Sequence, residues 1–118
     1  MGLTLGLSLG NNQTTPPPSV PDTICGAIHS RHEISANRGT TALILAPHAV
    51  YWKIGQPDAL WLDAVIVSEN GTPPRKAKLD GFKLTDLADV TALEATFEPF
   101  AGFKPGSSKY AGKSRCTI

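Results

Sequence analysis

Three segments between residues 46 and 87 decide the fold, namely Ala46-Pro47-His48-Ala49-Val50-Tyr51, Ala59-Leu60-Trp61-Leu62-Asp63-Ala64-Val65-Ile66-Val67 and Gly81-Phe82-Lys83-Leu84-Thr85-Asp86-Leu87. In the second segment, alternate residues point to opposite faces of an extended chain, and both faces are mostly apolar. This pattern predicts a central strand over residues 60–67. The first and third segments predict its neighbours, because apolar and aromatic residues in them are bounded by proline and glycine.

Outward from this centre, the sequence predicts further short strands at residues 33–36, at 40–46 with a continuation at 50–52, at 79–84 and at 90–96. Pro47 interrupts the ladder, which predicts a bend or an edge position there. A helix is expected at about residues 22–31, because Asp22 or Thr23 can cap it and Ile24 and Ile28 share one face. Five short strands that curl into a barrel leave little exposed edge. The expected fold is therefore mainly β, a small five-stranded barrel with one N-terminal helix.

The length of 118 residues supports one domain. We expect a flexible, proline-rich leader at residues 1–21, the barrel domain at 22–105 and a basic C-terminal tail at 106–118. The Leu/Gly alternation in residues 3–9 is compatible with an edge strand or with disorder. Seven basic and ten acidic residues lie between positions 22 and 100, whereas residues 101–118 hold four basic residues and no acidic one. The net charge of +1 provides no general attraction to nucleic acid or to an anionic membrane.

The two cysteines, Cys25 and Cys116, are too few and too far apart for a disulfide framework or a zinc ribbon. They are therefore predicted to be free thiols in a reducing compartment. No apolar run approaches the roughly 18 residues that a membrane span requires, and the N-terminus lacks the basic start of a signal peptide. A cytoplasmic protein without a membrane partner is expected.

The same segments resemble a WYL domain in its short, stand-alone bacterial form, over about residues 22–105. The corner Ala46-Pro47-His48, the strand Leu60-Trp61-Leu62, the strand end Phe82-Lys83-Leu84-Thr85-Asp86-Leu87 and the segment Pro99-Phe100-Ala101-Gly102-Phe103-Lys104-Pro105 are similar to features of that family. The chain departs from the family pattern at Ala46, where the family has Glu, and at Asp86, where it has Arg. The resemblance implies an Sm-like small barrel with a helix before its first strand. In longer members, it also implies contact with nucleotide-like or nucleic-acid ligands.

An aromatic and basic surface is the leading candidate site. Arg75 and Lys76 follow a Pro-Pro loop, and with Tyr51, Trp61 and Lys83 they could bind a nucleotide or a single strand by stacking and charge. The alternative is a solvated loop that keeps the protein soluble.

His48 completes the candidate site residues, because a histidine at a strand bend can contact an anion or act as a base with Asp63. The favoured alternative is a hydrogen bond from His48 to the backbone at the bend. Asp63 itself is expected to pair with Lys53 or Lys83 across the sheet, to lie at a ligand site, or to face solvent.

Two further chemistries receive little support. Cys25, His29 and His32 follow a helical spacing that suits zinc, but their stripe borders residues that must face the core. The sequence contains no phosphate-binding glycine loop and no nucleophile elbow. We therefore predict no catalytic residue, metal or cofactor.

The predicted function is a non-enzymatic ligand-sensing or regulatory module for a nucleotide-like anion or single-stranded nucleic acid. The alternative is a protein-interaction or oligomerisation module without a small-molecule ligand, in which edge strands pair between copies.

Overall fold

The structure is a computed structural model that describes residues 19–118. It contains the helix α1 (Val20–Ser30), the strands β2 (His32–Arg38), β3 (Thr41–Trp52), β4 (Leu60–Glu69) and β5 (Leu79–Lys83), the 3-10 turn η1 (Leu84–Asp86), and the strands β6 (Ala88–Thr96) and β7 (Ser114–Thr117). Within residues 19–118, the mainly β character and one α-helix before the first strand are confirmed. The predicted leader lies almost entirely outside the described residues, as does the possible edge strand at residues 3–9.

Helix α1 begins two residues earlier than expected, because Ser19 caps it rather than Asp22 or Thr23. The Ser19 hydroxyl accepts a hydrogen bond from the Asp22 backbone N–H at 3.3 Å, and a proline occupies the first turn. The helix ends at Arg31, which adopts a left-handed conformation with φ 60°. These signals fix the register in which Ile24 and Ile28 face the sheet.

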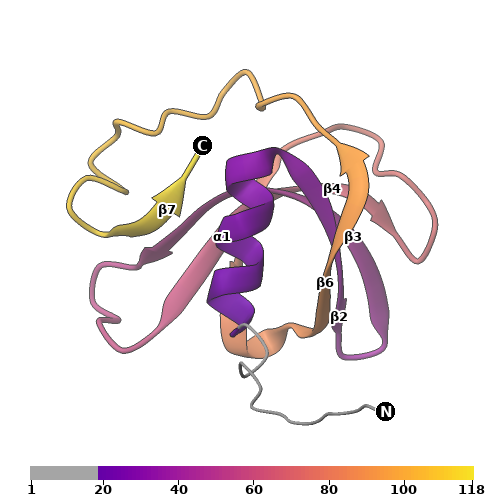
Figure 1. Ribbon diagram of the computed structural model, residues 1–118, viewed down its shortest axis with the longest axis horizontal. Coiled ribbons are helices and arrows are strands. Elements are labelled where there is room, and N and C mark those ends of the chain that lie inside the picture. Colours follow the sequence, from indigo (N-terminus) through magenta and orange to yellow (C-terminus); the bar gives the residue numbers. More distant parts are fainter. Residues whose placement is uncertain (1–18) are drawn as a thin grey trace, which may run out of the picture.

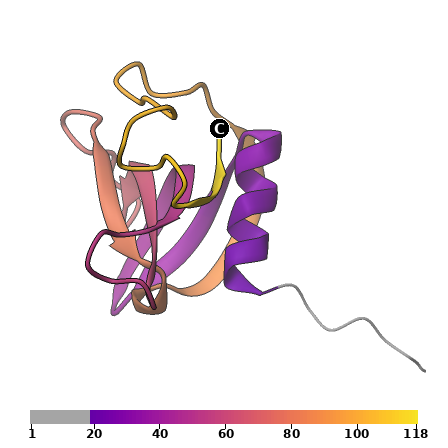
Figure 2. The ribbon, with the colours of Figure 1, turned by 90° about the vertical axis from the view of Figure 1, so that its left-hand side faces the viewer.

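The strands form one antiparallel sheet in the order β5-β4-β3-β2-β6, and β7 pairs with β3 beside this path. β3 is long enough to serve two neighbours on one side, since its first half pairs with β2 and its second half with β7. Figure 1 shows α1 lying across the curved sheet, with the last residues returning beside it, and Figure 2 shows α1 at one side of the strands. The sheet has six strands among the described residues. Its two edge strands, β5 and β6, do not pair with each other, so the sheet is not closed into a barrel.

Pro47 is followed by a β-bulge in β3. Pro47 lies opposite Ala64 and Ala49 lies opposite Asp63, so β3 advances two residues where β4 advances one. The additional residue is His48. The bulge reverses the alternation of side chains, which allows both Leu45 and Val50 to face the main core although they differ by an odd number.

Two apolar clusters result, one on each face of the sheet. The larger cluster packs α1 against the inner face through residues such as Ile24, Ile28, Leu62 and Phe82. The smaller cluster lies on the other face and contains Ala49, Tyr51 and Tyr110, with Trp61 and Phe103 partly buried against them. Both faces of the central strands are therefore covered, as the apolar pattern of residues 60–67 predicts.

We call residues 97–118 the C-terminal segment. It supplies Phe103 and Tyr110 to the smaller cluster and then forms β7. This differs from the expected tail at residues 106–118, because β7 is part of the sheet and Tyr110 and Cys116 are buried. No helix within residues 19–118 is both long and apolar enough to cross a membrane.

Candidate functional site

Three of the predicted site residues form a row across the sheet. Tyr51 on β3 is the partner of Trp61 on β4, and Trp61 is the partner of Lys83 on β5. Directly opposite residues share a face, so the sheet brings these side chains together. Tyr51, however, is buried, whereas Trp61 and Lys83 are half-buried. Of these three residues, only Trp61 and Lys83 are accessible to a ligand in this structure, because Tyr51 is buried.

Trp61 is held by two neighbours from the turn between β3 and β4. Its indole N–H donates to the side-chain oxygen of Gln56 at 3.2 Å. The ammonium of Lys53 lies 4.1 Å from the centre of the ring, which is a cation–π contact. These contacts fix the orientation of the indole beside Lys83.

Arg75 and Lys76 lie elsewhere. They are exposed in the loop between β4 and β5, beyond the pair Val65–Leu79, whereas Lys83 pairs with Trp61 at the other end of β5. Leu79 and Lys83 are four positions apart along the strand, which corresponds to a distance of about 13 Å. The sheet register therefore does not place Arg75 and Lys76 in the row of Tyr51, Trp61 and Lys83, and both residues lie in an exposed loop.

His48 is fully buried and both ring nitrogens have backbone partners. Nδ1 lies 2.8 Å from the Ala46 carbonyl oxygen, and Nε2 accepts a hydrogen bond from the Phe100 N–H at 2.9 Å. Nδ1 therefore carries the proton. Burial lowers the pKa of His48, which favours this neutral form. Its backbone carbonyl also accepts a hydrogen bond from Ile118.

His48 consequently attaches the C-terminal segment to the bulge. The rings of Phe97 and Phe103, which belong to that segment, lie 5.2 and 5.1 Å from the imidazole centre. The predicted backbone hydrogen bond at the bend is confirmed. A role for His48 as an anion contact or as a base has no accessible nitrogen to support it.

Asp63 is a buried acidic residue on the face of the sheet that carries the smaller cluster, and 2% of its surface is exposed. The Tyr51 hydroxyl donates to Oδ1 at 2.8 Å, and the Tyr110 hydroxyl donates to Oδ2 at 2.5 Å. The ammonium of Lys109 lies 2.7 Å from Oδ2. The expected pairing with Lys53 or Lys83 is therefore wrong, because the cation that pairs with Asp63 is Lys109 of the C-terminal segment.

The tyrosines respond to this carboxylate. Burial, together with the hydrogen bond to Asp63, raises the pKa of Tyr51 and of Tyr110 above the ordinary value of 10.0. Both hydroxyls therefore remain protonated donors at neutral pH. Sequence reasoning missed Tyr110 and Lys109, and the only signal was an aromatic residue within an otherwise polar, glycine-rich tail.

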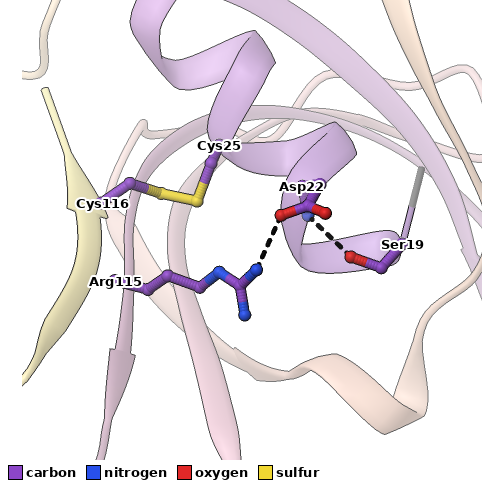
Figure 3. Close-up of a disulfide and its surroundings, with 5 residues drawn as sticks. All are labelled: Ser19, Asp22, Cys25, Arg115 and Cys116. Atoms are coloured by element: carbon purple, nitrogen blue, oxygen red, sulfur yellow. Dashed lines mark hydrogen bonds and ion pairs between the residues drawn. A yellow bond between two sulfur atoms is a disulfide. The ribbon is translucent and has the colours of Figure 1, made fainter.

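The cysteines are joined, which corrects the prediction of two free thiols. Cys25 on α1 and Cys116 on β7 form a disulfide across 91 positions of sequence. Figure 3 shows this bond beside the ion pair in which Arg115 donates to Asp22 at 2.6 Å. The zinc site of Cys25, His29 and His32 is thereby excluded, since the thiolate ligand is used in the disulfide. Within residues 19–118 no three potential metal ligands gather.

A groove of about 820 Å³ lies between the start of α1, the turn after β3 and the η1 region. Its walls are mainly apolar and include Leu60, Leu84 and Leu87. Lys83 and Asp58 add one charge of each sign. This volume lies within the range of about 300–1,000 Å³ that is typical of small-molecule sites. The groove is therefore the candidate functional site, and Lys83 links it to the aromatic row.

Comparisons with protein-family models, curated proteins and solved structures found no match.

Proposed function

We propose that this protein is a non-enzymatic binding module that takes a small, nucleotide-like anion in the groove beside Lys83. The proposal rests on one observation. Lys83 lines a mainly apolar groove and also lies beside Trp61 in the row across the sheet. Ligand sites typically combine apolar walls with a few polar groups that fix orientation.

The lining suits a ligand with three chemical parts. Leu60, Leu84 and Leu87 can cover an apolar or aromatic body, and Lys83 can neutralise an anionic group. Asp58 and Gln56 can accept hydrogen bonds from amino groups of the ligand. A nucleotide has all three parts, whereas a simple fatty acid lacks the donors.

The arrangement favours a small ligand over single-stranded nucleic acid. A strand is normally held by several stacking residues and a continuous basic path. Here Tyr51 is buried, and Arg75 and Lys76 lie beyond the far end of β5. The non-enzymatic part of the proposal is supported by His48 and Asp63, because every polar side-chain atom of both residues is engaged in a hydrogen bond within the protein.

Calorimetric titration with a set of nucleotides at low salt tests this function. We expect saturable binding that weakens as salt rises. Lys83→Ala should reduce the affinity about tenfold to one-hundred-fold, which corresponds to the loss of a charge-assisted hydrogen bond of about 1.5–3 kcal/mol. Lys76→Ala removes the same charge far from the groove and is the matched control.

Two results would reject the proposal. One is the absence of saturable binding by any nucleotide at low salt. The other is an equal loss of affinity in Lys76→Ala and Lys83→Ala, which would indicate a general charge effect instead of a site.

An oligomerisation module is the second candidate, supported by the edges of the sheet. β5 and β6 each lack a strand partner on one side among the described residues, and most of β6 is exposed. An uncovered edge can pair with a strand of another copy. Pairing of β5 with the β6 of a neighbour would be head-to-tail and would give a ring or a filament. Light scattering over a dilution series tests this, and a monomer at every concentration would exclude it.

The family and the location are also proposals. An N-terminal helix before a strongly bent antiparallel sheet supports the WYL-like domain and the Sm-like barrel. The disulfide removes the support for a cytoplasmic location and favours an oxidising compartment. Trapping free thiols by alkylation at the moment of cell lysis tests the location, because a cytoplasmic protein would be alkylated at both cysteines.

A further inference from the structure

Asp63 and its partners Tyr51, Tyr110 and Lys109, which we call the Asp63 cluster, combine the features by which proteins bind an ammonium group. A buried carboxylate requires a compensating cation, because transfer of a charge from water is costly unless it is paired. Each carboxylate oxygen accepts one hydrogen bond from a tyrosine hydroxyl, but these hydroxyls carry no positive charge. The cation is the Lys109 ammonium, 2.7 Å from Oδ2.

Aromatic faces complete the surroundings of this ammonium. The Lys109 nitrogen lies 5.2 Å from the centre of the Tyr51 ring and 5.7 Å from that of Tyr110. Both distances are within the range of cation–π attraction. The two rings meet edge to face, with centres 5.3 Å apart, so they form two walls around the carboxylate.

The lysine is less firmly held than the groups that bind it. Half of the Lys109 side chain is exposed to solvent, whereas Asp63, Tyr51 and Tyr110 are all buried. The ammonium therefore reaches the carboxylate from the solvent side. Withdrawal of Lys109 would leave a buried anion with aromatic walls and an opening to water.

We propose that Asp63, Tyr51 and Tyr110 form a recognition site for a primary alkylammonium group, and that Lys109 is its internal, displaceable ligand. The external ligand is a lysine side chain of a partner or a free alkylamine. A primary ammonium is required because Oδ2 accepts an N–H hydrogen bond, which a quaternary ammonium cannot donate. This site is separate from the groove of the proposed function.

Chemical rescue tests the proposal. Lys109→Ala removes the internal ligand and should lower the Tm. n-Butylammonium chloride should then raise the Tm in a saturable manner, while sodium chloride and tetramethylammonium chloride at equal ionic strength should not. The double variant Asp63→Asn with Lys109→Ala has no carboxylate and should show no rise with n-butylammonium.

An equal rise with all three salts, or a rise in the double variant, would overturn the proposal, as would the absence of a rise with both n-butylammonium and a lysine tripeptide. A lysine tripeptide and the matching norleucine tripeptide distinguish the source of the ligand. A rise with the lysine peptide alone assigns the site to a partner's lysine, and a rise with n-butylammonium shows that a free amine is sufficient.

A second measurement applies if Lys109→Ala does not fold. Lys109→Met retains an apolar stem of similar length, and the ring signals of Tyr51 and Tyr110 can be followed by NMR. Saturable shifts with n-butylammonium, absent with tetramethylammonium, would support the site. Unchanged ring signals would overturn it.

Discussion

Removal of the Cys25–Cys116 disulfide should lower the free energy of unfolding by about 4.6 kcal/mol. The bond closes a loop of 91 positions. The chain-entropy relation for a loop of this length gives about 4.6 kcal/mol at 25 °C, because the cross-link restricts the unfolded chain. For a domain of this size, each 1 kcal/mol shifts the Tm by about 4–5 °C. The expected loss is therefore roughly 18–23 °C.

Thermal unfolding followed by tryptophan fluorescence measures this loss, with and without a dithiol reductant. The double variant Cys25→Ser with Cys116→Ser is the control, since reductant should not change its Tm. The strands β3 and β7 should separate first in the reduced protein, because they pair at only three positions. Hydrogen exchange at the backbone N–H of Trp52, which donates to the Lys113 carbonyl, would report this separation.

A loss of stability of less than about 1 kcal/mol on reduction would contradict this prediction, because it is well below the value that the chain-entropy relation gives. Titration of two thiols by a thiol-reactive chromophore in the folded, unreduced protein would contradict it as well. The second outcome would show that the cysteines are not joined and would restore the expectation drawn from the sequence.

Three further predictions concern the attachment of the C-terminal segment. Tyr110→Phe should destabilise the protein by about 1.5–3 kcal/mol in chemical denaturation, because it removes a hydrogen bond to a buried carboxylate; a change below about 0.5 kcal/mol would mean that the bond contributes little. The chain has two tyrosines and the pKa of each is raised, so the phenolate absorbance of the folded protein should develop only above pH 10. Phenolate formation at or below that pH without unfolding would contradict the burial of Tyr51 and Tyr110 against Asp63. Burial lowers the pKa of His48 below 6.5, so the unfolded chain takes up a proton before the folded one does, and stability should fall as the pH drops below about 6.5. His48→Gln should lack this part of the pH dependence, and an unchanged slope would refute it.

Most elements of the fold could be predicted from local patterns. The helix at residues 20–30 and the strand at 60–69 lie within two residues of their expected bounds, because apolar residues recur with helical and strand periods. β7 was not predictable in this way, since Ser114–Thr117 is short and largely polar. It forms because the second half of β3 has an edge that β2 leaves open.

The candidate site was only partly predictable. Tyr51, Trp61 and Lys83 lie on one row because the register of β3, β4 and β5 aligns them. Arg75 and Lys76 are close to Lys83 in sequence, but they precede β5 whereas Lys83 is its last residue, so the length of the strand separates them. Partners distant in sequence, such as Tyr110 and Lys109 for Asp63, leave no periodic signal near that residue.

By itself, the sequence determined most of the segments that are helix and strand, β7 excepted, and which of their faces are apolar, because both depend on neighbours within a few residues. The tertiary structure alone decided that the cysteines join, that His48 and Asp63 attach the C-terminal segment, and that the sheet remains open among residues 19–118. Each of these contacts brings together residues far apart along the chain, and their proximity is set by the packing of the whole domain.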